Sequence, residues 1–131
     1  MVFLTEACSM KKVVPEKGNI EHYIVRLTLT DWIRTWYLIF EKTQTSIQWQ
    51  ETFYDDDSWQ TVSCADRRDL QSVLARLQRA QTKPGYDPLL ANCEQFARFV
   101  VEGESYSTQV RAGMLIAGIV FATTLIIARQ K

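Results

Sequence analysis

The residues whose type and spacing could support chemistry in this sequence are a cysteine and its immediate neighbours. In YDPLLANCEQFARF, residues 86–99, Cys93 follows Asn92 at the point where a loop gives way to a helical pattern. Asn92 is a favoured N-cap residue, and Gln95 is placed to complete a capping box. The start of a helix favours an anion, and the thiolate is the nucleophilic form of cysteine. The position therefore suits a nucleophile, although it also suits a small buried residue.

A nucleophilic thiol needs a base, and His22 is the one histidine in the chain. The base is normally a histidine within hydrogen-bond distance of the nucleophile. His22 begins a predicted strand, and a histidine on a strand can face a cysteine at the start of a helix. We therefore pair His22 with Cys93; the alternative is a structural or exposed histidine.

The elements that must position this pair are strands in the first half of the chain. Strand patterns of β-branched and aromatic residues occur at residues 22–29 (HYIVRLTL), 36–41 (WYLIFE), 45–53 (TSIQWQETF) and 59–63 (WQTVS). The three aspartates at residues 55–57 lie between the last two strands. They lack the spaced ligands and the glycine of a calcium loop, so we interpret them as a solvated turn.

Two helices are predicted in the second half. Residues 69–81 (DLQSVLARLQRAQ) form an amphipathic helix whose apolar face is Leu70, Val73, Leu74 and Leu77, and it ends at residues 82–85. A second helix runs over residues 93–102, with Gly103 placed to end it. Strands followed by helices predict an α+β fold with a small antiparallel sheet packed on helices.

Composition and cysteine usage exclude several classes of function. Residues 1–109 carry 12 basic and 15 acidic side chains, so their formal charge is −3, and no basic stripe indicates a nucleic-acid partner. With no CxxC motif and one histidine, we expect no metal site and no cofactor. The simplest interpretation of Cys8, Cys64 and Cys93 is reduced thiols in a cytosolic compartment.

A second region begins after residue 109. Residues 112–128 (AGMLIAGIVFATTLIIA) contain no charge, with Arg111 before them and Arg129 and Lys131 after them. A helix of this length nearly spans a bilayer, and the flanking arginines can reach its surface. The alternative is a buried helix of the core. We predict a domain at residues 1–109 and a single-pass C-terminal membrane anchor at 110–131, with the domain facing the cytosol.

The segment YDPLLANCEQFARFVVEGESYSTQVR resembles the asparagine–cysteine box of the lecithin:retinol acyltransferase-like proteins. Among these it is most similar to the small phospholipase A/acyltransferases with a C-terminal membrane anchor. The matching residues are Asn92, Cys93, Glu94, Phe96, Gly103, Ser107, Gln109 and Val110. Gln95 stands where the family usually has a non-catalytic histidine. The resemblance is strong over residues 69–131 and weak over residues 18–62.

The resemblance implies a circularly permuted papain-like domain that cleaves an acyl ester of a glycerophospholipid through a cysteine thioester. The thioester then passes to water, an amine or a lysophospholipid. Cys93 would be the nucleophile and His22 the base, with Asn92 and Gln95 supporting the start of the helix. The partners would be the phospholipid substrate and the bilayer.

The chain departs from the family at the residue that orients the base, which is usually a histidine on the next strand. If residues 36–41 form that strand, Leu38 or Ile39 takes the position, and neither side chain can accept a proton. Glu41 is our first choice to replace the histidine, with Gln44 and Gln48 as further candidates.

A second register aligns residues 36–41 with the family's first strand. Thr35 or Trp36 would then occupy the base position, His22 would have no role, and the chain would be a pseudoenzyme. Three hypotheses follow: a membrane-anchored thiol acyltransferase or phospholipase, a catalytically impaired relative that binds lipid or protein at a membrane, and a tail-anchored adaptor whose cysteine is structural.

Overall fold

The sheet contains five strands, and it is followed along the chain by two α-helices. The structure is a computed structural model that describes residues 1–43, 46–82 and 92–103. The strands are β1 (Phe3–Val14), β2 (Ile20–Thr30), β3 (Thr35–Lys42), β4 (Ile47–Thr52) and β5 (Gln60–Cys64). The helices are α1 (Leu70–Thr82) and α2 (Cys93–Glu102), and short 3-10 turns precede β2 and α1.

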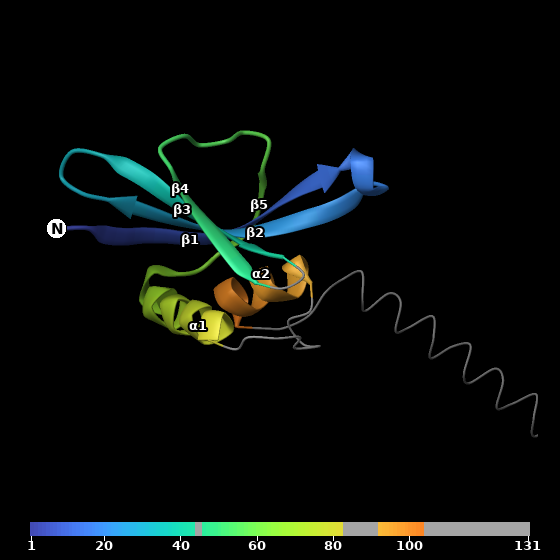
Figure 1. Cartoon of the computed structure of the whole chain (residues 1–131). Helices are drawn as coiled ribbons and strands as arrows, with labels where there is room; N and C mark the ends of the chain where they lie inside the picture. The colour runs from blue at the N-terminus through green and yellow to red at the C-terminus, as the bar shows by residue number, and fades with distance from the viewer. Residues whose placement is uncertain (44–45, 83–91, 104–131) are drawn as a thin grey trace, which may run out of the picture.

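The strands lie in the order β4-β3-β2-β1-β5, and every pairing is antiparallel. Both helices pack on one face of this sheet, while the connection between β4 and β5 rises on the opposite face (Figure 1). The coarse prediction of an α+β fold with a small antiparallel sheet packed on helices is therefore confirmed. The four predicted strands correspond to β2 to β5, with ends that differ by a few residues.

β1 is the strand that the sequence patterns do not predict, although it pairs with both β2 and β5. Its middle residues, Ala7, Cys8, Ser9 and Met10, are all buried. A strand that is buried on both faces loses the polar–apolar alternation by which a half-exposed strand is detected. The small and polar side chains of this segment further weaken the sequence pattern by which a strand is recognised.

The main core lies between the sheet and the helices. Tyr23, Val25 and Leu27 alternate along β2 and point to the helices, as the two-residue period of a strand requires. On α1 the buried residues are Leu70, Val73, Leu77 and Ala80. The predicted apolar face was wrong at Leu74, which is 43% exposed. The buried face of α1 is narrower than the predicted face, because it does not include Leu74. It extends further along the helix than predicted, as far as Ala80.

α2 begins and ends where the sequence predicts. The Asn92 side chain accepts a hydrogen bond from the Gln95 backbone N–H at 2.8 Å, which confirms the N-cap. Gly103 ends the helix with φ +79°, a left-handed conformation that glycine adopts without strain. Arg76 of α1 donates to the carbonyl oxygens of Val100 and Val101 in the last turn of α2, which ties the two helices together.

A disulfide joins Cys8 of β1 to Cys64 of β5. The expectation of three reduced cysteines was therefore wrong for these two, and Cys93 is the free one. The two residues are direct partners in the antiparallel β1–β5 pairing, which brings their side chains together across 56 positions of sequence. Sequence spacing alone cannot reveal such a pairing. Disulfides are typical of oxidising compartments, so this bond does not favour the cytosolic orientation that we predicted.

Several predictions fall on residues outside the described ranges. They are most of the segment that ends the first predicted helix, the matching residues Ser107, Gln109 and Val110, and the proposed anchor at 110–131. Among the residues that the structure describes, no helix is long and apolar enough to cross a membrane.

Candidate active site

The candidate site lies where the pairing of β2 with β3 stops. The paired residues run from Thr30 and Thr35 to Val25 and Phe40, so the first part of β2 extends beyond its contact with β3. The start of α2 approaches this part of β2. The Tyr23 backbone N–H donates to the Cys93 sulfur at 3.4 Å, and the thiol lies 4.0 Å from the Glu21 carbonyl oxygen. The free cysteine thus contacts the backbone on both sides of His22.

His22 connects this cysteine to a carboxylate on the neighbouring strand. Its Nε2 atom lies 2.9 Å from Oε1 of Glu41, near the end of β3. The Cys93 thiol and the imidazole are close enough that each shifts the pKa of the other. Because Nε2 lies against Glu41, Nδ1 is the ring nitrogen left for the sulfur. The structure thus brings a thiol, an imidazole and a carboxylate together.

The pKa values of His22 and Cys93 are shifted in opposite directions. The hydrogen bond with Cys93 is the largest cause that raises the pKa of His22 above 6.5, with smaller contributions from Glu41, and together they outweigh the lowering effect of burial. Burial alone would raise the pKa of the Cys93 thiol. The hydrogen bonds from His22 and from the Tyr23 backbone outweigh it, so the pKa lies below its ordinary value. Both pKa shifts are therefore in the direction of a thiolate and an imidazolium.

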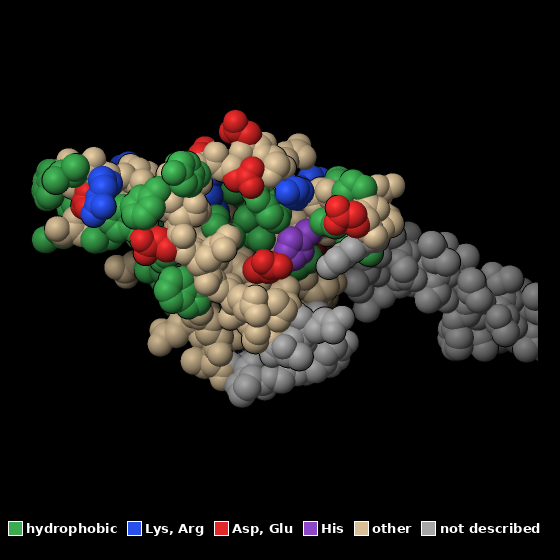
Figure 2. Space-filling view, turned by 45° about the horizontal axis from the view of Figure 1, so that its top comes forward, with side chains coloured by type: hydrophobic (Ala, Val, Ile, Leu, Met, Phe, Trp, Pro, Cys, Tyr) green, Lys and Arg blue, Asp and Glu red, His purple; other side chains and the backbone are tan. Residues whose placement is uncertain are grey.

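Trp59 lies beside the imidazole of His22, and sequence reasoning did not single it out. Its ring lies 5.8 Å from the imidazole, centroid to centroid, at a tilt of 51°. The purple histidine in Figure 2 lies at the molecular surface among acidic, basic and hydrophobic side chains, consistent with the 27% exposure of the His22 side chain. Trp59 directly precedes β5, far from His22 in sequence, so only the folded sheet reveals the contact.

Buried charge supports the helix that carries the thiol. Glu94 is 2% exposed and accepts a hydrogen bond from Arg98 at 3.0 Å along α2. Arg98 also lies over the Tyr23 ring at 5.8 Å, which fixes the helix against β2. A buried carboxylate is tolerated only when paired, so this ion pair constrains the first turn of α2.

The structure therefore brings together Cys93, His22 and Glu41, with Asn92 and Gln95 at the start of the same helix. For Gln95, the hydrogen bond from its backbone to Asn92 is present. Of the other candidates for orienting the base, Gln48 pairs with Glu41 across β3 and β4 but is not the residue bonded to the imidazole. Gln44 lies outside the described residues.

The second sequence register placed Thr35 or Trp36 at the base position. These residues pair with Thr30 and Leu29, at the opposite end of β2 from His22. The histidine next to the free cysteine is His22 itself. In the folded chain the side chain beside the free cysteine is therefore that of His22, and Thr35 and Trp36 lie away from it.

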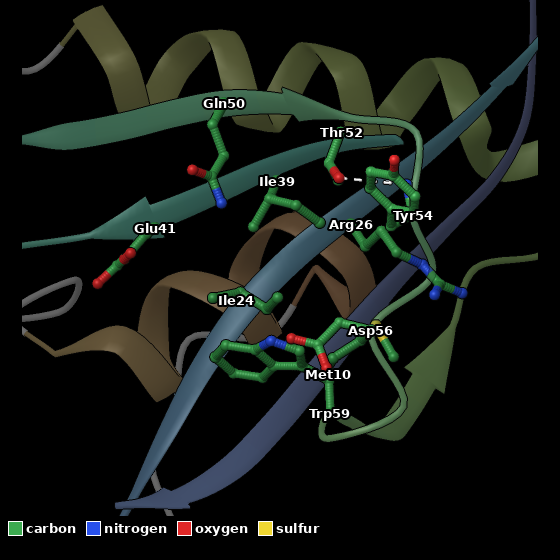
Figure 3. A pocket seen from close by; sticks show the side chains of 10 residues that line it. All are labelled: Met10, Ile24, Arg26, Ile39, Glu41, Gln50, Thr52, Tyr54, Asp56 and Trp59. Atoms are coloured by element: carbon green, nitrogen blue, oxygen red, sulfur yellow. Dashed lines mark hydrogen bonds between the residues drawn. The ribbon is translucent and has the colours of Figure 1, made fainter. Parts of the chain in front are cut away.

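A groove opens beside this site on the sheet face that carries no helix. We call it the open-face groove; it has a volume of about 440 Å³. Figure 3 shows Ile24 and Ile39 between Glu41 on one side and Arg26 and Tyr54 on the other. Its lining residues are Met10, Ile24, Arg26, Ile39, Glu41, Gln50, Thr52, Tyr54, Asp56 and Trp59.

Two groups of potential metal ligands have other partners. Ligand atoms of Glu6, Cys8 and Cys64 lie within 4.8 Å of one another, but both sulfurs belong to the disulfide. In the aspartate turn, Asp55 accepts a hydrogen bond from Arg26, and Asp56 accepts from Ser58. These contacts agree with the interpretation of residues 55–57 as a solvated turn.

The arrangement can carry out nucleophilic catalysis with general-base assistance. A thiol at a helix start, a histidine close to it and a carboxylate that binds the histidine are the groups required for attack on an acyl carbonyl. Comparisons with protein-family models, with curated proteins and with solved structures find no match for the chain.

Proposed function

We propose that the chain is a thiol acyltransferase or phospholipase A that acts on acyl esters of glycerophospholipids at a membrane. The observation that supports this most is the proximity of His22 to both the Cys93 thiol and the Glu41 carboxylate. The resemblance of the segment around Cys93 to the lecithin:retinol acyltransferase-like proteins supplies the substrate class. On this proposal the domain has a permuted papain-like fold.

The first step is attack by the Cys93 thiolate on the ester carbonyl carbon. The carbon–oxygen bond of the ester breaks, and the imidazolium of His22 gives its proton to the leaving alkoxide. The backbone N–H groups at the start of α2 are placed to stabilise the oxyanion that forms in between. Water, an amine or an alcohol then attacks the thioester, His22 takes its proton, and the sulfur leaves as thiolate.

Glu41 replaces the second histidine of the family in this mechanism. Its carboxylate accepts a hydrogen bond from the imidazole at Nε2, which leaves Nδ1 as the ring nitrogen that acts on the thiol. A carboxylate performs the same orienting task for histidine in other hydrolases. The missing second histidine therefore does not by itself imply an inactive enzyme.

A test uses the full chain, phosphatidylcholine vesicles and mass spectrometry of the protein. We expect an acyl adduct on Cys93 that is absent from Cys93→Ser. His22→Ala and Glu41→Gln should slow its formation by roughly 10²–10⁴-fold, the usual contribution of acid–base assistance. Glu51→Gln, a change on β4, is the matched control for Glu41→Gln. An adduct that forms equally fast in His22→Ala would refute the assignment of the base.

A structural cysteine is the second candidate, and one contact favours it. The Cys93 sulfur accepts the Tyr23 backbone N–H, a role that needs no chemistry. Under this hypothesis the chain is an adaptor or an inactive relative that binds lipid or protein at a membrane. Vesicle binding by the full chain without any Cys93 adduct would support it.

Membrane attachment is a separate part of the proposal, and it depends on the uncharged run at residues 112–128. A bilayer anchor would hold the site near lipid substrate and raise its effective concentration. Deletion of residues 112–128 should release the protein from the membrane fraction of an expressing cell. Retention of the shortened protein in that fraction would contradict the anchor.

A further inference from the structure

The open-face groove has an apolar floor. Met10 and Ile24 are 4% and 1% exposed and form a second core cluster, against which Ile39 and Trp59 pack. In Figure 3 the side chains of Ile24 and Ile39 lie in the centre of the lining. The volume of about 440 Å³ is within the range of roughly 300–1,000 Å³ that is usual for small-molecule sites. The groove therefore has room for a small molecule with an apolar body.

One end of the groove carries a cation that already has its counter-ions. Arg26 donates to Asp55 at 2.7 Å and to Glu6 at 3.2 Å. Its guanidinium also lies over the Tyr37 ring at 5.0 Å, and its side chain is 13% exposed. A guanidinium with two carboxylate partners offers no net positive charge to a ligand. This end of the groove therefore does not favour an anion.

The other end of the groove carries a carboxylate with an unused oxygen. Glu41 lies on the opposite side of Ile24 and Ile39 from Arg26 (Figure 3). Its Oε1 atom lies 2.9 Å from Nε2 of His22. Among the residues that the structure describes, Oε2 of Glu41 makes no hydrogen bond, and the side chain is 47% exposed. Glu41 can therefore accept from a ligand that enters the groove.

The remaining charges of the lining leave this preference for a cation in place. Asp56 is a second carboxylate in the lining, and its Oδ1 atom accepts two hydrogen bonds from Ser58. Lys12, which lies over Trp59 at 5.7 Å, offsets one of the two carboxylates. A cationic group is therefore most favourable at the Glu41 end of the groove, away from the guanidinium at the other end.

We propose that the open-face groove binds an organic cation, with its ammonium group at Glu41 and its apolar body over Ile24 and Ile39. The ligand is an effector that does not react, so the inference is independent of the proposed chemistry at Cys93. Because Glu41 also bonds His22, the ligand and the imidazole compete for one carboxylate. Occupation of the groove therefore acts on the candidate site through Glu41, without contact between the ligand and the thiol.

The test compares three ligands that share a phenylbutyl group and differ in charge: 4-phenylbutylammonium, 4-phenylbutanol and 5-phenylvalerate. The full chain is placed in nanodiscs of an ether-linked phosphatidylcholine, which has no acyl ester, and isoleucine methyl NMR signals follow each titration. The signals of Ile24 and Ile39 should shift, and that of Ile33, which is 89% exposed and outside the lining, should not. An exposed ion pair is worth up to about fivefold in affinity, so the ammonium should bind about fivefold more tightly than the alcohol, and the carboxylate most weakly.

A matched pair of variants locates the charge that the ligand recognises. Glu41→Gln should abolish the preference for the ammonium over the alcohol, while continued binding of the alcohol shows that the groove is intact. Glu51→Gln removes a carboxylate from β4, outside the groove lining, and should keep the fivefold preference. Partition of the ligands into the nanodisc is the same for both variants, so it does not imitate this difference.

Competition for Glu41 is measured on the imidazole. The titratable and charged groups around His22 are Cys93 of α2, Glu41 of β3 and Lys12, its partner on β1. In an NMR titration, saturating 4-phenylbutylammonium should lower the pKa of His22, because a cation at Glu41 weakens a partner of the imidazolium; 4-phenylbutanol should not. By linkage, the ammonium should bind more tightly above this pKa than below it.

Three outcomes overturn the binding site: unshifted signals of Ile24 and Ile39, equal affinities for the ammonium and the alcohol in the unmodified chain, and a preference for the ammonium that survives in Glu41→Gln. An unchanged pKa of His22 at saturating ammonium overturns the competition for Glu41. None of these measurements involves acyl transfer, so they give their answer whether or not the proposed function holds.

Discussion

The His22 imidazole has two partners that both favour its protonated form. The bond with Cys93 has the larger effect on the pKa, the Glu41 carboxylate has a smaller one, and burial opposes both. Loss of either partner should therefore lower the pKa of His22, and loss of the thiol should lower it more. In the proposed mechanism this balance matters because the base must be able to release its proton near neutral pH.

The first prediction concerns which of the two partners, Cys93 or Glu41, has the larger effect on the pKa of His22. In an NMR titration of the imidazole, Cys93→Ser should lower the pKa of His22 further than Glu41→Gln does, since serine does not ionise in this range. As the pH rises, the variants should lose the imidazolium earlier than the unmodified chain. The control Glu51→Gln should titrate like the unmodified chain. A larger shift in Glu41→Gln than in Cys93→Ser would show that the carboxylate, not the thiol, dominates.

The second prediction concerns the helix cap. Asn92→Ala removes the acceptor for the Gln95 N–H and should cost about 1 kcal/mol of unfolding free energy. It should also raise the pKa of Cys93, because a frayed first turn holds a thiolate less well. The pH midpoint of iodoacetamide alkylation measures this. Asn92→Ser, which keeps a capping oxygen, should restore both properties; an alkylation midpoint unaffected by Asn92→Ala would contradict the link.

At the scale of elements, β1 and β5 are joined covalently as well as by hydrogen bonds. β5 is a short strand at the edge of the sheet, and it follows directly after Trp59, which lies beside His22. The Cys8–Cys64 bond closes a loop with a sequence separation of 56. A loop of this length restricts the unfolded chain strongly, so the bond should contribute substantially to stability.

The third prediction follows from this bond. Reduction of the disulfide should lower the free energy of unfolding by about 4 kcal/mol, as measured by urea denaturation with and without a reductant. Cys64→Ser should already have the lower stability, since Cys64 is exposed and its replacement leaves no cavity in the core. A further loss on adding reductant to Cys64→Ser, or no loss in the unmodified chain, would contradict the assigned role of the bond.

The elements that the sequence predicts are those with a clear pattern or a clear end signal. α2 has an asparagine cap and a terminal glycine, and β2 to β5 are rich in β-branched and aromatic residues between polar turns. β1 escapes detection because its middle is buried on both faces and contains a serine. The sequence pattern places Leu74 on the buried face of α1, because helical spacing shows which residues form the apolar stripe. It does not show which part of the stripe packs against the sheet.

At the scale of the whole molecule, the site joins segments that only the antiparallel sheet brings together. The sequence, with a family resemblance, predicted that Cys93, His22 and Glu41 act together, because each offers a chemical group that the other two require, and the structure brings the three side chains together. The contribution of Trp59 could not be predicted, since an aromatic residue at a strand start has many possible neighbours. The groove could not be predicted either, because it depends on which sheet face the helices leave open (Figure 1).

One contact determines which substitution of Cys93 is the better test of the proposed chemistry. The Cys93 sulfur is the acceptor for the amide of Tyr23 at a place where β2 has lost its neighbouring strand. Alanine at position 93 would leave that amide without its acceptor, and an unsatisfied buried amide costs about 1–3 kcal/mol. Serine retains an oxygen there. A knockout designed with alanine would therefore combine lost chemistry with a locally loosened backbone, whereas serine would remove the chemistry alone.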